Sequence, residues 1–123
     1  MSRSVCLRLF AFLLLLTSAT QAGEFALYLL AGQSNMDGYG SVDDLPERLS
    51  EAQDGVWIFH GNSTPDAVAV DGRGAWLPLA PGHGRGFSSD GEAHVRSDRF
   101  GLELSFAERM RALHPDRKVA LVK

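Results

Sequence analysis

The chain has 123 residues, of which 45% are hydrophobic and 22% are charged, and its formal net charge is -3 at pH 7. This composition is typical of a globular protein and excludes a disordered or fibrous chain. A mildly acidic chain without a clustered basic face is not expected to bind nucleic acid.

The first 22 residues are predicted to be a signal peptide. Arg3 and Arg8 lie at the start of an apolar run over residues 9–16, and Ala22 follows it. A membrane anchor is the alternative, but this run is well short of the roughly 20 residues that cross a bilayer. We therefore expect cleavage near Ala22, secretion or export to the periplasm, and no stable membrane insertion. Cys6 would leave with the leader, so no disulfide is expected.

Two apolar runs predict buried strands of a parallel sheet. Residues 24–31 are almost continuously apolar, which is typical of a strand buried on both faces. Residues 56–59 form a second run of this kind. Between them, residues 45–53 are expected to form a short helix with Pro46 in its first turn.

A long irregular segment and then a helix follow the second strand. Residues 61–99 are rich in glycine and charge, with one short apolar piece at 75–79, and predict a functional or mobile connection. Residues 100–113 are predicted to form an amphipathic helix, because apolar side chains recur every three to four positions. The members of this stripe are Leu102, Phe106, Met110 and Leu113. Residues 119–122 predict another buried strand, so the order of elements indicates an α/β fold with a parallel sheet.

The segment Gly-Gln-Ser-Asn-Met-Asp-Gly at residues 32–38 follows directly on the first apolar run. A serine on a tight turn after a buried strand is held rigidly at the edge of a sheet, as a hydroxyl nucleophile must be. The segment is not the G-x-S-x-G elbow, because Met36 stands in place of the second glycine. The alternative is an ordinary strand-to-helix turn in which the Ser34 hydroxyl caps the helix.

Residues 31–38 resemble the first sequence block of the SGNH-type esterases in the sialate O-acetylesterase and acetylxylan esterase group, carbohydrate esterase family six. Residues 56–59, 76–82 and 100–107 are similar to later features of that group, in the same order. The resemblance covers essentially the whole mature chain. It implies a flavodoxin-like, three-layer SGNH hydrolase fold, with residues 23–123 as the amino-terminal portion of one esterase domain.

The resemblance also implies an activity, that of a secreted carbohydrate O-acetylesterase acting on an acetylated carbohydrate without a cofactor. Ser34 would be the nucleophile, and its backbone N–H together with that of Gly101 would stabilise the oxyanion. Gln33 and Asn35 are candidate substrate-binding residues. The sequence has no clustered metal-ligand spacing, so no metal site is predicted.

Leu102 and Glu103 follow Gly101 directly. Leu102 stands where this group commonly has proline, which puts only the rigidity of the turn in question, because leucine keeps its N–H. Glu103 matches a glutamate of the group and is interpreted as a charge in the first turn of the helix.

The base of the proposed reaction is missing from the sequence pattern. In this esterase group the histidine and its aspartate occur as Asp-x-x-His, and the 123 residues contain no such motif. Asp37 is given no catalytic role, because a carboxylate at a helix start stays ionised. The histidines are interpreted as structural or solvent-exposed: His60, His83, His94 and His114. We therefore expect a fragment whose Asp and His lie beyond Lys123.

A second function class stays open at this point. The chain could be a non-catalytic glycan-binding or interaction module that presents Trp57, Trp76 and Phe87 to a sugar, although core packing explains the two tryptophans more simply. Residues 82–86 are glycine-rich but lack the flanking strand and helix of a phosphate site, so they predict a flexible turn.

Overall fold

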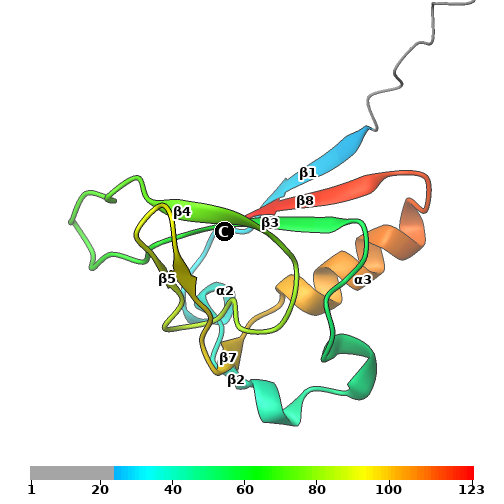
Figure 1. Ribbon diagram of the computed structural model, residues 1–123, viewed down its shortest axis with the longest axis horizontal. Helices are drawn as coiled ribbons and strands as arrows, with labels where there is room; N and C mark the ends of the chain where they lie inside the picture. The colour runs from blue at the N-terminus through cyan, green and yellow to red at the C-terminus, as the bar shows by residue number, and fades with distance from the viewer. Residues whose placement is uncertain (1–23) are drawn as a thin grey trace, which may run out of the picture.

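A four-stranded sheet organises residues 24–123, the part of the chain that the computed structural model describes (Figure 1). Its strands lie in the order β1 (Phe25–Leu29), β8 (Lys118–Val122), β3 (Val56–Gly61) and β4 (Gly74–Pro78). β8 pairs in parallel with β1 and β3, and β4 pairs antiparallel with β3. The prediction of a mixed α/β fold with a mainly parallel sheet is confirmed. The predicted leader lies outside the described residues.

Seven short elements and one longer helix, α3, connect these strands. They are α2 (Ser34–Asp37), β2 (Gly40–Ser41), the 3-10 turns η1 (Val42–Asp44) and η2 (Glu47–Leu49), β5 (Ser88–Ser89), β6 (His94–Val95), β7 (Arg99–Phe100) and α3 (Glu103–Leu113). The antiparallel pairing of β2 with β7 joins the chain after Ser34 to the chain before α3. Among residues 24–123, no helix is long and apolar enough to cross a membrane.

The core lies between one face of the sheet and α3. Val56, Ile58, Val119 and Leu121 are the buried residues of the central strands on this face. Leu104 and Ala107 are the fully buried apolar residues of α3, whereas three members of the predicted stripe are only partly buried. The fourth, Leu113, is 50% exposed at the end of α3.

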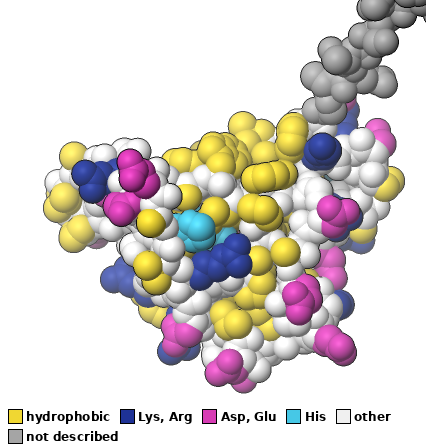
Figure 2. Space-filling view, in the orientation of Figure 1, with side chains coloured by type: hydrophobic (Ala, Val, Ile, Leu, Met, Phe, Trp, Pro, Cys, Tyr) yellow, Lys and Arg dark blue, Asp and Glu magenta, His cyan; other side chains and the backbone are white. Residues whose placement is uncertain are grey.

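The opposite face of the sheet carries exposed apolar side chains. The register gives two rows on it, Leu27–Ala120–Trp57–Pro78 and Leu29–Val122–Phe59–Trp76. Leu29 is 73% exposed, Trp57 41% and Trp76 51%, and Figure 2 shows hydrophobic side chains gathered along the upper side of the view, over the strands. The predictions that β1 and β3 are buried on both faces and that both tryptophans belong to the core are therefore wrong. No element within residues 24–123 covers this face, so a three-layer fold stays a prediction.

Other boundaries differ from the prediction for local reasons. Residues 45–53 do not form one helix, because Pro46 holds Leu45 in an extended conformation and separates η1 from η2. The apolar piece at residues 75–79 is most of the edge strand β4. α3 begins at Glu103 rather than at residue 100, because Arg99 and Phe100 pair with β2.

The glycine-rich segment over residues 82–86 is packed rather than flexible. Gly82, His83 and Gly84 are buried. A Cβ on Gly84 would lie 2.5 Å from the carbonyl carbon of Arg99, so only glycine allows this close approach. The segment therefore packs closely against β7.

Candidate active site

Ser34 is the first residue of α2, and its side chain is exposed where the chain leaves β1. The turn is closed by backbone bonds from Met36 N–H to Gln33 O at 2.8 Å and from Gly38 N–H to Ser34 O at 2.9 Å. No side-chain hydrogen bond caps α2, so the interpretation of Ser34 as a helix cap is wrong. The first N–H groups of a helix have no partner within it, which leaves the amide of Ser34 available to a ligand.

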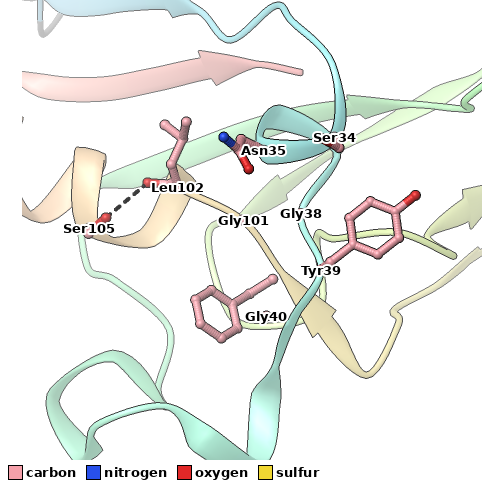
Figure 3. A pocket seen from close by; sticks show the side chains of 9 residues that line it. Ser34, Asn35, Gly38, Tyr39, Gly40, Gly101, Leu102 and Ser105 are labelled. Carbon is pink, nitrogen blue, oxygen red and sulfur yellow. Dashed lines mark hydrogen bonds between the residues drawn. The ribbon is translucent and has the colours of Figure 1, made fainter.

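A pocket of about 380 Å³ lies between α2 and the start of α3 (Figure 3). It is lined by Ser34, Asn35, Gly38, Tyr39, Gly40, Phe100, Gly101, Leu102 and Ser105. In the close-up, Asn35 extends from α2 toward the start of α3. Three of the residues that the sequence predicted for the site, Ser34, Asn35 and Gly101, therefore meet around one pocket.

Close backbone packing joins the two sides of this pocket. Gly38 has φ 86°, and a Cβ on it would lie 2.5 Å from the backbone nitrogen of Gly101. Only glycine fits there, because a side chain would need both a disfavoured conformation and space that the neighbouring backbone occupies. The turn that carries Ser34 is thus held directly against Gly101.

The N–H of Gly101 is already engaged by a side chain. It donates to Glu103 Oε1 at 2.8 Å. Its predicted role as an oxyanion donor stays a prediction, which requires the N–H to be shared between Glu103 and a substrate. Glu103 is fully buried and pairs with Lys123 Nζ at 2.8 Å, so its interpretation as a simple charge in the first helical turn is incomplete.

A larger cavity, about 850 Å³, opens at the carboxyl ends of the parallel strands. Ser34 and Gln33 line it together with Gly61, the last residue of β3, and Lys123, which follows β8. In open α/β sheets, ligands bind at this end of the strands, and the volume is that of an ordinary ligand site. Ser34 is therefore shared by two cavities.

His60 and His83 form a buried pair beside the larger cavity. Their Nδ1 atoms are 3.2 Å apart, and His60 stacks on Phe87 with ring centroids separated by 4.1 Å. Burial lowers the pKa of His60 to about 4; the positive charge of Lys123 lowers it further and the carboxylate of Asp37 opposes this. Burial, followed by His60 and nearby cations, lowers the pKa of His83 to about 3. Both rings are therefore neutral at pH 7.

The remaining candidates are two exposed histidines and a paired carboxylate. His94 is exposed on β6, and His114 is exposed just after α3. Asp37 is held by Arg85, with Asp37 Oδ2 3.1 Å from Arg85 Nη1. Within residues 24–123, no cluster of three or more His, Cys, Asp or Glu side chains is placed to hold a metal ion.

Comparison of the chain with known protein families gives one match. The model of the family described as carbohydrate esterase, sialic acid-specific acetylesterase, matches residues 24–123. The chain belongs to this family. The resemblance that residues 31–38 and the later blocks indicated is thereby confirmed, and the family is one of carbohydrate esterases. No curated protein and no solved structure matches the chain.

Sequence reasoning missed the contacts of three residues around the candidate site. Lys123 follows an apolar strand and carries no motif, so nothing in the sequence pointed to its contact with Glu103. The pairing of His60 with His83 joins the end of β3 to the loop at residues 82–86, which is distant in sequence. The only available signal was the position of His60 and Lys123 at strand ends, where parallel strands bring side chains together.

Proposed function

We propose that this protein is a secreted carbohydrate O-acetylesterase in which Ser34 forms an acyl-enzyme. The observation that carries the proposal is an exposed serine hydroxyl that caps no helix and opens to two cavities at the carboxyl end of a mainly parallel sheet. Membership of a carbohydrate esterase family supports ester hydrolysis as the reaction class. The acetyl group, the glycan and secretion are the further content of the proposal.

The proposed reaction has two steps. Ser34 Oγ attacks the acetyl carbonyl carbon while its proton passes to a base, and the sugar alcohol leaves after taking up a proton. Water then attacks the acyl-serine, which releases acetate and restores the hydroxyl. The negative charge on the carbonyl oxygen is stabilised by backbone N–H groups, for which we propose Ser34 and Gly101.

The reaction needs a proton acceptor for Ser34. The rings of His60 and His83 are within hydrogen-bond distance of each other. Their pKa values are lowered to about 4 and about 3, which makes them weak bases. We therefore propose that the base is the histidine of an Asp-x-x-His motif outside residues 24–123. Reading the coding frame around this segment tests that point directly, and a frame without the motif contradicts it.

The two cavities suit different parts of an acetylated glycan. The smaller pocket, about 380 Å³, adjoins Ser34, Gly101 and Leu102 and has room for a short acyl group. The larger cavity is lined by polar side chains such as Gln33 and Ser63, which hydrogen-bond readily to sugar hydroxyls. We propose that the acetyl group enters the first and the sugar the second.

Replacement of the nucleophile is the direct test. We expect Ser34→Ala to lower kcat for release of acetate from acetylated glycans by about a thousandfold or more. Ser105→Ala is the matched control, because Ser105 lines the same pocket but donates its hydroxyl to Leu102 O at 3.3 Å. It should change kcat only a few-fold. Undiminished hydrolysis by Ser34→Ala would rule out the mechanism.

A specific observation favours a second candidate, a non-catalytic glycan-binding module. Trp57 and Trp76 lie on the uncovered face of the sheet, where aromatic rings could stack on sugars, whereas Phe87 is buried and unavailable. Calorimetric titration of Ser34→Ala protein with acetylated and deacetylated glycans separates the candidates. Binding that is lost in Trp57→Ala and insensitive to acetylation would support the module.

Export is tested separately from activity. The proposed leader predicts that protein recovered outside the cytoplasm begins at Gly23. Amino-terminal sequencing of that protein checks the cleavage site.

A further inference from the structure

Glu103 and Lys123 form a charged pair that lies buried next to Gly101. The exposed fraction is 5% for the Lys123 side chain and 0% for Glu103. Removing two charges from water costs several kcal/mol per ion, and a well-packed apolar pair of the same size is often at least as stable. Stability alone therefore does not account for this pair.

Both members of the pair also bind backbone groups that adjoin the proposed site. Glu103 Oε1 accepts from the N–H of Gly101 at 2.8 Å. Lys123 Nζ donates to the carbonyl oxygen of His83 at 2.5 Å. The pair thus connects the segment before α3 with the packed loop at residues 82–86.

These two segments converge on Gly38, the residue that ends the Ser34 turn. Gly101 packs against it so closely that a Cβ on Gly101 would lie 3.1 Å from Gly38 Cα. From the other side, the backbone N–H of Arg85 donates to Gly38 O at 2.8 Å, and the Arg85 guanidinium binds Asp37 at 3.1 Å. The turn that carries Ser34 is therefore held between two segments that the buried pair joins.

We propose that Glu103 and Lys123 are positioning residues that hold the Ser34 turn and the Gly101 peptide in register. This inference rests on the proposed function of Ser34. The pair does not touch the reacting atoms; its effect passes through Gly101 and Gly38. Rates of covalent reactions fall steeply when the reacting atom is displaced by about 1 Å, so loss of this support lowers kcat more than it raises KM.

Two charge-neutral double variants test the proposal. Glu103→Gln/Lys123→Met keeps a side-chain oxygen for the N–H of Gly101, whereas Glu103→Leu/Lys123→Met has a similar volume and no acceptor. Both remove the buried charges, so they differ mainly in the contact with Gly101. Thermal unfolding checks that each variant folds.

Three measurements are compared in the full-length protein. In the leucine variant we expect the Gly101 amide to exchange with solvent about tenfold faster than in the glutamine variant. Ser34 should react about tenfold more slowly with a fluorophosphonate, and kcat should fall by a similar factor with KM nearly unchanged. Equal exchange and equal reaction rates in the two variants would overturn the proposal.

The outcomes keep this inference apart from the proposed function. If the parent protein neither hydrolyses esters nor reacts with the fluorophosphonate, the proposed function of Ser34 fails. Amide exchange at Gly101 and at Gly38 then still decides whether the pair holds both segments. Equal exchange rates in the leucine and glutamine variants would contradict the positioning role of Glu103 and Lys123. If the leucine variant does not fold, Glu103→Asp replaces it, because the shorter side chain withdraws the acceptor from Gly101.

Discussion

His60 and His83 are expected to make the stability of the protein depend on pH. Their pKa values are about 4 and 3 in the folded chain, whereas an unperturbed histidine has 6.5. Between pH 6.5 and these lowered values the unfolded state binds more protons, so the free energy of unfolding falls as the pH falls. The groups that face the pair are Lys123, Asp37, Arg96 and His94.

Urea unfolding at several pH values measures this effect. From pH 7 to pH 4.5 we expect a loss on the order of 2 kcal/mol from each ring of the pair. His60→Asn should flatten the dependence, because it removes one of the two buried rings whose pKa is lowered. His114→Gln is the control, since His114 is exposed at the end of α3. The same slope in His60→Asn and in the parent would contradict the assignment.

Single residues also show which features could be predicted from the sequence and which could not. The turn that carries Ser34 was predicted because the strand before it and the glycines around it form a local pattern. Glu103 was placed correctly at the start of a helix, but its burial depends on Lys123, which is distant in sequence. A local pattern cannot reveal that partner, because burial is set by what packs from elsewhere in the chain.

At the scale of elements, the contact of α2 with the segment before α3 is made by glycine. Gly38 has φ 86° and no room for a Cβ, whereas Gly55 has φ 71° and nothing within 4 Å of that position. Gly55→Ala should therefore cost about 1 kcal/mol, from backbone strain alone. Gly38→Ala should cost about 3 kcal/mol, because overpacking adds to the strain.

Chemical denaturation of the two glycine variants checks this prediction. Equal losses of unfolding free energy would show that Gly38 does not pack against Gly101 as described. The fluorophosphonate reaction of Ser34 in Gly38→Ala gives a second reading, and we expect it to be slower than in Gly55→Ala.

Elements with strong periodic patterns were predicted well, and weak ones were not. The strands at residues 56–61 and 118–122 and the helix α3 follow from apolar runs and a helical repeat. β4 was missed as a strand because a short apolar piece in a glycine-rich segment becomes a strand only by pairing with β3. Pro46 divided a segment that was expected to be one helix.

The whole molecule presents one apolar face to solvent. Leu27, Leu29, Trp57 and Trp76 are exposed there, on neighbouring strands. Large exposed apolar patches promote association. We expect residues 24–123 to associate as their concentration rises, and Leu27→Lys/Leu29→Lys to reduce this without lowering the unfolding free energy much, because both side chains are already exposed.

Sedimentation velocity over a range of concentrations measures the association. Asp43→Lys/Asp44→Lys is the control, because it adds the same kind of charge at η1, away from this face. A parent chain that stays monomeric at high concentration would contradict the prediction.

The amino-acid sequence by itself determined the α/β class, the esterase family and the serine turn, because these follow from short apolar runs and contiguous motifs. Only the tertiary structure decided which face of the sheet is covered, that Ser34 is shared by two cavities, and that Glu103 binds both Gly101 and Lys123. The physical reason is that propensity and periodicity act between near neighbours. Burial, hydrogen-bond partners and pKa values are set by residues that folding brings together from distant parts of the chain.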